Sequence, residues 1–337
     1  MRREFVELAR CPACRAEGTL ELEVTEEDAR EVRRGTLTCS ACGAARGIER
    51  GIADLMPDDP PEFVRREAAG LARFAEEMRS KDWDRERVLN LPYEQDGYWY
   101  AQATAMHQTL ANAELDFQPG KRILDVGSNT CWASATFAEN RLETYALDIA
   151  PVEMQGLATA DWWFEGKGVY FERMLGLMFD VPLADGVLDY VWCCEVLHHN
   201  HRANLWETMR ELHRVLKPGG RLIVVNESVR ALKTLKLRPG HEVAEYEGHE
   251  HAYLRRSYLK AAREAGFQVE LVGPWIHPTF TDAHYIIKPE HSALVAFRSA
   301  ARHSVRRSRA ARAARLAWKN YVSGTALYMI GTKPVTM

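Results

Sequence analysis

Four cysteines near the start of the chain have the types and spacing of metal ligands. Two Cys-x-x-Cys pairs, Cys11 with Cys14 and Cys39 with Cys42, are separated by 24 residues. Each pair brings two thiolates to one turn, so two turns can supply the tetrahedral four-sulfur site that zinc favours. A redox motif or an unrelated pair of reduced thiols would explain one pair, but neither requires a second copy. The spacing therefore predicts a zinc site, and because four protein ligands close it, a structural one.

A second set of residues, in the middle of the chain, could bind a nucleoside. The segment ILDVGSNTCWAS, residues 123–134, ends an apolar run with Asp125 and a turn that contains one glycine, Gly127. A dinucleotide-binding turn would carry two further glycines, which bring the backbone against a pyrophosphate. Here Asn129 takes one of these places, and asparagine tolerates the left-handed backbone that such a turn needs. The turn can therefore form, but it is not built for a pyrophosphate.

Asp148 ends the next apolar run, 23 residues after Asp125. An acid about 20 residues beyond such a turn typically accepts hydrogen bonds from ribose hydroxyls. A nucleoside without a pyrophosphate is what S-adenosylmethionine presents, and its methionine ammonium suits an acid near Asp125. The missing glycines argue against an NAD-dependent oxidoreductase.

The elements that must position these residues alternate between strands and helices. Apolar segments typical of strands lie at residues 121–127, 142–151, 168–174, 186–196 and 219–228, with helical patterns between them. This alternation predicts βαβ units and a mostly parallel sheet. Segments 267–275 and 325–334 are predicted to be two closing strands without a clear crossover helix in the usual place. Ligands of such sheets bind outside the carboxyl ends of the strands.

The order of motifs in this region resembles that of class I S-adenosylmethionine-dependent methyltransferases, especially the small-molecule group. The matching segments are ILDVGSNTCWAS, YALDIAP, FDVPLADGVLDYVWCCEVLHHN, HRVLKPGGRLIVV and HEHAYLRRSYLKAAREAGF, within residues 119–273. The resemblance implies an α/β fold, with a Rossmann-like, doubly wound, mostly parallel seven-stranded sheet whose last strand is antiparallel. It also implies S-adenosylmethionine as the cofactor.

The same resemblance implies where the cofactor lies. Asp125 and the turn border the methionine moiety, Asp148 holds the ribose, and Ile149 lies near the adenine. The aspartate that usually precedes PLADG is absent from its aligned place, so backbone groups near residue 178 or the later Asp180 would serve the adenine. The expected cofactor residues are Asp125, Gly127, Ser128, Asn129, Asp148, Ile149, Met178, Phe179, Asp180 and Glu195.

Two histidines lie where the family places its methyl acceptor. His198 and His199 follow the fourth predicted strand, and either could remove a proton from a hydroxyl acceptor. The alternative is that they hold the loop, which we favour for each histidine alone. Cys193 and Cys194, inside the apolar strand, are expected to pack in the core rather than act as nucleophiles.

The chain divides into a zinc-ribbon module at 1–57, a helical linker or lid at 58–118, and a methyltransferase domain at 119–337. Residues 1–57 resemble the ribbon of tRNA-methyltransferase activator proteins, which also occurs ahead of some bacterial methyltransferases. Because so short a unit buries little core, zinc is expected to supply much of its folding energy. Insertions at 227–252 and 274–322 are expected to roof the pocket, and 298–319 is predicted to form an arginine-rich helix.

Bulk composition narrows the function. The formal net charge is −3, which does not suggest a polyanion-binding chain, and no stretch approaches eighteen apolar residues. We therefore expect a cytoplasmic protein without membrane insertion. The leading hypothesis is O-methylation of a small molecule or glycan. An RNA-base methyltransferase that uses the ribbon and the arginine helix, and a non-enzymatic activator or scaffold, stay open as alternatives.

Overall fold

The computed structural model describes residues 1–81, 83–93, 102, 103, 106, 109, 110, 118–201, 203–232, 251–272, 314, 317 and 326–335. Most of the expected insertions at 227–252 and 274–322, most of the 94–117 part of the linker, and nearly all of the arginine-rich segment 298–319 lie outside the described residues. The predictions made for them stay predictions.

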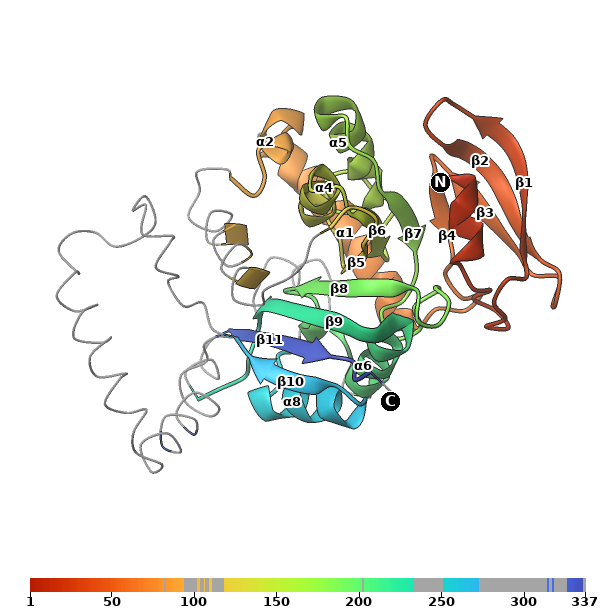
Figure 1. Ribbon diagram of the computed structural model, residues 1–337. Helices are drawn as coiled ribbons and strands as arrows, with labels where there is room; N and C mark the ends of the chain where they lie inside the picture. The colour runs from red at the N-terminus through yellow and green to blue at the C-terminus, as the bar shows by residue number, and fades with distance from the viewer. Residues whose placement is uncertain are drawn as a thin grey trace.

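One continuous sheet forms the framework of the described residues (Figure 1). It has eleven strands in the order β1-β2-β3-β4-β7-β6-β5-β8-β9-β11-β10. The strands are β1 Leu20–Glu27, β2 Val32–Cys39, β3 Ala45–Glu49, β4 Ile52–Asp54, β5 Arg122–Val126, β6 Glu143–Asp148, β7 Glu172–Leu175, β8 Leu188–Cys194, β9 Leu216–Glu227, β10 Gln268–Leu271 and β11 Leu327–Thr332.

The seven strands from β7 to β10 form the predicted methyltransferase sheet. Strands β7, β6, β5, β8 and β9 run parallel, while β11 is antiparallel to both β9 and β10. The prediction of a mostly parallel sheet with an antiparallel last strand is therefore confirmed. The strand order reverses direction at β5 and β8, and in open α/β sheets such a switch point is where ligands bind.

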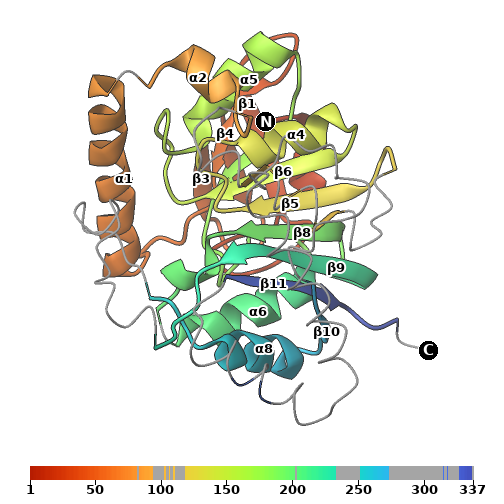
Figure 2. The ribbon, with the colours of Figure 1, turned by 90° about the vertical axis from the view of Figure 1, so that its left-hand side faces the viewer.

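Helices cover both faces of this sheet, which explains why its central strands read as apolar runs. One buried cluster packs α6 and α8 against the sheet, and the other packs α4 and α5 against the opposite face. Helix α1 lies along one side of the molecule, apart from these layers (Figure 2). The helices are α1 Glu62–Ser80, α2 Arg85–Leu89, α4 Trp132–Glu139, α5 Ala160–Lys167, α6 Asn204–Val215 and α8 Arg255–Glu264, with short 3₁₀ turns η1 Arg3–Glu7, η2 Leu157–Thr159 and η3 Leu197–His199.

The N-terminal module extends the same sheet. Strands β1 to β4 form an antiparallel meander, and β4 then pairs parallel with β7 through Ile52–Arg173 and Ala53–Met174. Residues of the module, such as Phe5, belong to the same buried cluster as residues of the central strands, such as Tyr145. The ribbon therefore shares both sheet and core with the rest of the chain. Among the described residues, no helix has the length and apolar character needed to cross a lipid bilayer.

Candidate functional site

The four cysteines of the N-terminal module converge on one point. Their sulfur atoms all lie within 4.8 Å of one another, and the Cys11–Cys42 and Cys14–Cys39 sulfur pairs are both 3.7 Å apart. Four sulfurs at the usual zinc–sulfur distance of about 2.3 Å would be about 3.8 Å apart in a tetrahedron. The arrangement therefore fits a zinc ion, with Cys11 and Cys39 buried beneath Cys14 and Cys42.

The turn after β5 forms with a single glycine. Gly127 has a φ of +69°, and a Cβ atom there would clash with the side chain of Val196. Asn129 and Cys131 also adopt left-handed backbone conformations, with φ of +45° and +59°. Helix α4 begins directly afterwards, at Trp132. A small residue and an asparagine therefore carry the bend that glycines would carry in a dinucleotide site.

Asp148 is fixed at the end of β6 by the turn itself. Its Oδ2 accepts a hydrogen bond from the Asn129 N–H at 2.8 Å. Its Oδ1 accepts from the N–H groups of Ile149 and Ala150 at 2.7 and 3.0 Å. Burial raises the pKa of Asp148 to about 6, although these backbone donors oppose the shift. The carboxylate is thus held rigidly beside the turn.

Asp125 lies at the neighbouring strand end. Its Oδ2 accepts from the Ser134 Oγ at 2.6 Å and from the Ser134 N–H at 3.1 Å. Burial, and then the nearby charge of Asp148, raises the pKa of Asp125 to about 7. Two buried acids in adjacent parallel strands therefore lie close enough to repel each other. A ligand that brings positive charge between them would stabilise both in their charged forms.

The loop after β7, which contains Met178, Phe179 and Asp180, contacts other parts of the chain. Met178 accepts a hydrogen bond at its sulfur from the Asn200 side chain at 3.2 Å, and the Phe179 ring packs near Phe63 of α1. Asp180 instead faces the ribbon. Its carboxylate pairs with Arg10 at 2.5 Å and with Arg15 at 3.2 Å, the two arginines that flank the first cysteine pair.

His198 is held in a buried network. Its Nδ1 lies 2.8 Å from the Glu227 Oε1 at the end of β9. Glu227 also accepts from the backbone N–H groups of residues 196–198 and from the Tyr258 hydroxyl. Burial would raise the pKa of Glu227, but the charge of His198 and these donors outweigh it, so the pKa is lowered. Glu227 is fully buried, and no pattern in the sequence identifies it as a partner of His198.

His199 pairs with a residue from the helix at the side of the molecule. Its Nδ1 contacts the carboxylate of Glu67 in α1, which is itself buried. Two residues on, the ring of His201 stacks on Phe63 at 3.9 Å between centroids. Farther along α1, Arg79 pairs with Glu153 in the loop after β6. Helix α1 therefore spans the carboxyl ends of several strands, which is where the expected lid would lie.

Residues flanking the β8 tip also have clear surroundings. Glu195 adopts a left-handed conformation, with φ of +49°, and accepts a hydrogen bond from the Asn226 side chain. Burial raises the pKa values of the Cys193 and Cys194 thiols, which agrees with a packing role. Asp189 binds the Arg122 N–H and the ammonium groups of Lys121 and Lys217, so it supports the opposite end of the sheet.

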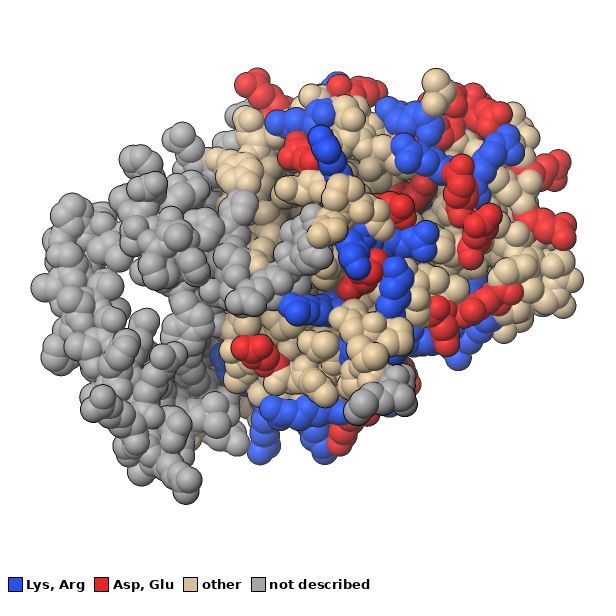
Figure 3. Space-filling view, in the orientation of Figure 1, with Lys and Arg blue, Asp and Glu red and all other residues tan. Residues whose placement is uncertain are grey.

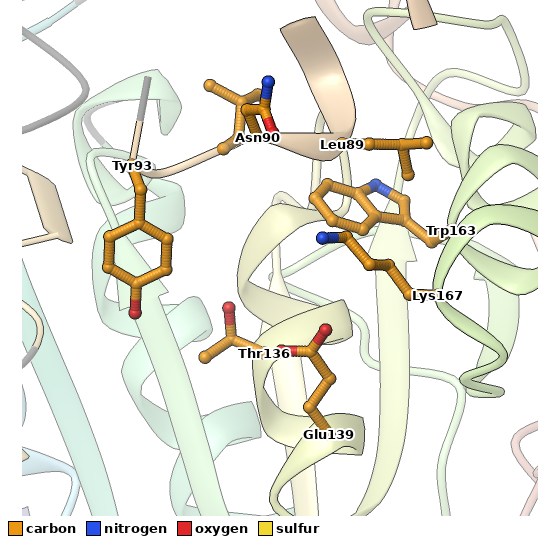
Figure 4. Close-up of a pocket in the computed structure, with 8 residues that line it drawn as sticks. Leu89, Asn90, Tyr93, Thr136, Glu139, Trp163 and Lys167 are labelled. Carbon is orange, nitrogen blue, oxygen red and sulfur yellow. The ribbon is translucent and has the colours of Figure 1, made fainter. Parts of the chain in front are cut away.

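A cavity of about 550 Å³ lies elsewhere, between helices α2, α4 and α5 (Figure 4). Its lining includes Thr136 and Glu139 of α4 and Trp163 and Lys167 of α5. None of the expected cofactor residues lines it. We therefore place the candidate site at the strand ends, where the polar groups converge.

Residues 124–224 match the family model described as a methyltransferase domain. The Cellvibrio japonicus biotin biosynthesis bifunctional protein BioHC is 29% identical over 50% of this chain and 33% of its own length. A Corynebacterium glutamicum demethylmenaquinone methyltransferase is 32% identical over 34% of this chain and 45% of its own. The Serratia marcescens malonyl-[acyl-carrier protein] O-methyltransferase is 28% identical over 46% of this chain and 56% of its own length. The chain thus covers between a third and somewhat over half of the length of each of these relatives.

Solved structures are similar only distantly. A complex of the Haloferax volcanii Trm112 methyltransferase activator with a methyltransferase aligns at a TM-score of 0.45 and 18% identity, covering 82% of this chain and all of that chain. A geranyl diphosphate methyltransferase aligns at a TM-score of 0.44 and 15% identity, covering 70% of this chain and 78% of that chain. These likenesses are too distant to support an argument about substrate. Residues 124–224 thus resemble a methyltransferase domain, and a four-cysteine module compatible with a zinc ribbon precedes them.

Proposed function

We propose that the protein transfers the methyl group of S-adenosylmethionine to an oxygen atom of a small molecule or glycan. The observation that carries the proposal is the pair Asp125 and Asp148, held at adjacent strand ends around a turn with one glycine. This arrangement offers hydrogen-bond acceptors to a ribose and negative charge to an ammonium. It offers no glycine-rich cradle to a pyrophosphate.

Each cofactor contact has a residue suited to it. Asp148, oriented by three backbone N–H groups, would accept the ribose hydroxyls. Asp125, with Gly127 and Ser128, would face the methionine end, and Ile149, Met178 and Phe179 would border the adenine. When bound, the sulfonium supplies an activated methyl group, so the protein mainly aligns the acceptor and excludes water. Asp180, paired with Arg10 and Arg15, suits the anchoring of the adenine-side loop better than contact with adenine.

A hydroxyl acceptor would also need a base, and the two loop histidines stay predictions for that role. In each, Nδ1 is bound to a carboxylate, so Nε2 is the atom that could take a proton. His198 is 7% exposed, while His199 is half-buried. The burial of His198 favours the role of holding the loop, and the greater access favours His199 as a base.

The face of the molecule in Figure 3 does not favour an RNA substrate. On the face in Figure 3, acidic and basic side chains are interspersed rather than gathered into one basic area. RNA-binding proteins usually show a basic patch or stripe. The non-enzymatic alternative differs from our proposal in one respect that is easily measured, namely the binding of cofactor.

Calorimetry with S-adenosylhomocysteine tests the proposal directly. We expect the folded protein to bind this product with one site per chain, and NADH, as the dinucleotide control, not to bind. Binding of S-adenosylhomocysteine by the wild type that is lost in Asp148→Ala would support the assigned site. A folded protein that binds neither compound would refute the enzyme assignment and favour the scaffold.

A further inference from the structure

The cavity between α2, α4 and α5 is not used in the proposed methyl transfer. Its volume of about 550 Å³ lies within the range of about 300–1,000 Å³ that is usual for small-molecule sites. Trp163, which is 2% exposed, lines the cavity, and its Nε1 donates to the Thr130 carbonyl in the cofactor turn at 2.8 Å. One buried side chain therefore joins the cavity to the cofactor turn, although none of the expected cofactor residues lines the cavity.

Helix α2 covers the cavity from a fixed position. Leu91, just after α2, is 3% exposed and belongs to the same buried cluster as residues of α4 and α5. Arg85 of α2 pairs with Glu165 of α5 at 3.0 Å. A Cβ atom at Gly166 would overlap the side chain of Leu89, so α2 lies directly against α5. The cavity is therefore preformed, which lowers the entropic cost of binding a ligand there.

The walls of the cavity combine apolar surface with two opposite charges. Leu89, Leu91 and the Trp163 ring provide the apolar contacts. Glu139 and Lys167, the last residues of α4 and α5, supply one negative and one positive charge. In Figure 4 the Lys167 side chain extends beside the Trp163 ring, and the Glu139 carboxylate points from α4 toward the same space. The cavity therefore suits a ligand with an apolar body and a charged end.

The chain leaves both of these charges without a counter-charge. Among the described residues, Lys167 and Glu139 form no ion pair, either with each other or with a third residue. The neighbouring Glu165, by contrast, is paired with Arg85. A ligand that carries both an ammonium and a carboxylate group can therefore contact the two charges together, which the chain itself does not do.

The α4 side of the cavity suits the ammonium group. Thr136 and Glu139 are three residues apart, so they share one face of the helix. The Thr136 hydroxyl donates to the Trp132 carbonyl at 2.8 Å, so its oxygen stays available as an acceptor. The carboxyl end of α4 adds partial negative charge beside Glu139. The α5 side offers the Lys167 ammonium, which suits a carboxylate.

We propose that this cavity is a second ligand site, which binds a zwitterionic small molecule of the amino-acid class with an apolar side chain. The ammonium of the ligand lies at Glu139 and Thr136, its carboxylate lies at Lys167, and its apolar body packs on Trp163. The proposal goes beyond the proposed function and does not depend on it, because the cavity and the expected cofactor site share no residue.

Three compounds with one phenyl body test the requirement for both charges. L-phenylalanine carries an ammonium and a carboxylate, phenethylamine carries the ammonium alone, and 3-phenylpropionate carries the carboxylate alone. Each is titrated into the protein with and without saturating S-adenosylhomocysteine, and binding is followed by NMR at the indole N–H of Trp163, assigned with Trp163→Phe. Because exposed charges contribute modestly, we expect L-phenylalanine to bind about threefold to fivefold more tightly than either analogue, with or without S-adenosylhomocysteine.

Two charge-removing variants assign the ends of the ligand. Lys167→Gln should no longer prefer L-phenylalanine over phenethylamine, because the carboxylate has lost its partner. Glu139→Gln should no longer prefer L-phenylalanine over 3-phenylpropionate, because the ammonium has lost its partner. Lys260→Gln on α8 and Glu270→Gln on β10 remove exposed charges away from the cavity, and both should keep the wild-type order of affinities.

Several results would overturn the inference. The wild type would fail to bind L-phenylalanine, or would bind all three compounds equally. Both charge-removing variants would keep the wild-type preferences, which would place the ligand elsewhere. S-adenosylhomocysteine would displace L-phenylalanine, which would place the amino acid in the cofactor site. Failure of the wild type to bind S-adenosylhomocysteine would instead refute the proposed function alone, since the preferences of the two variants would still test the cavity.

Discussion

Asp125→Asn should stabilise the ligand-free protein at pH 8 much more than at pH 5. Burial and Asp148 raise the pKa of Asp125 from its usual 3.8 to about 7, so the folded state binds a proton that the unfolded state has released. The stability associated with this proton is present at low pH and is lost as the pH rises from 3.8 through 7. Asparagine keeps an oxygen for the Ser134 donors and has no charge to desolvate.

The size of this stability difference follows from the shift in the pKa of Asp125. Each pKa unit corresponds to about 1.4 kcal/mol, so charging Asp125 costs the folded state about 4 kcal/mol in full. About 2–3 kcal/mol of this cost falls between pH 5 and pH 8. The stability gap between Asp125→Asn and the wild type should widen by that amount over the interval.

Urea unfolding at pH 5, 6, 7 and 8 measures this gap. Glu270→Gln serves as the control for removal of an exposed carboxylate. Because the comparison is a difference between two proteins, titration of groups distant from Asp125 cancels to a first approximation, whereas Asp148 is coupled to Asp125. A gap that stays constant with pH, or that narrows toward pH 8, would show that Asp125 is not a strained buried acid.

Other expectations concern the remaining parts of the site. Asp148→Ala should weaken S-adenosylhomocysteine binding by about tenfold or more in calorimetry, since it removes charge-assisted bonds to the ribose; unchanged affinity would refute the ribose role. His198→Ala should lower the free energy of unfolding by about 3–5 kcal/mol, because Glu227 loses its partner in a buried position; near-native stability in urea would contradict this. Cys14→Ser should reduce the bound zinc measured by mass spectrometry. It should also weaken S-adenosylhomocysteine binding several-fold, because Arg10, beside the metal site, holds the loop that contains Asp180. Full affinity for S-adenosylhomocysteine in zinc-free, folded protein would show that the two sites are independent.

The parts of the site that the sequence predicts are those set by local rules. A strand, a turn and an acid at the next strand end occur within 30 residues, and parallel pairing brings such ends together without further information. Asp125 and Asp148 are adjacent for this reason. The cysteines follow the same logic, since each pair is local and a bound metal would supply the point where the two pairs meet.

The partners that define the rest of the site come from far along the chain. Glu67 reaches His199 across 132 residues, and Arg10 reaches Asp180 across 170. In the sequence, nothing distinguishes Glu67 or Arg10 from the charged, solvent-exposed residues around them. Tertiary packing alone selects these residues, so no local pattern could have identified them.

The N-terminal ribbon is tied to the rest of the fold more closely than its local sequence pattern suggests. Taken alone, a short four-cysteine module suggests a unit that melts when zinc is removed and leaves the larger domain intact. In the structure, β4 pairs with β7, and an unpaired β7 would leave an open sheet edge. The ribbon segment before Cys11 also pairs with the loop after β7, through Ala9 with Leu183. A metal bound by the four cysteines would hold the ribbon, and the ribbon pairs with the edge strand β7 and with the loop that follows it. We therefore expect metal binding and cofactor binding to stabilise one shared folded state.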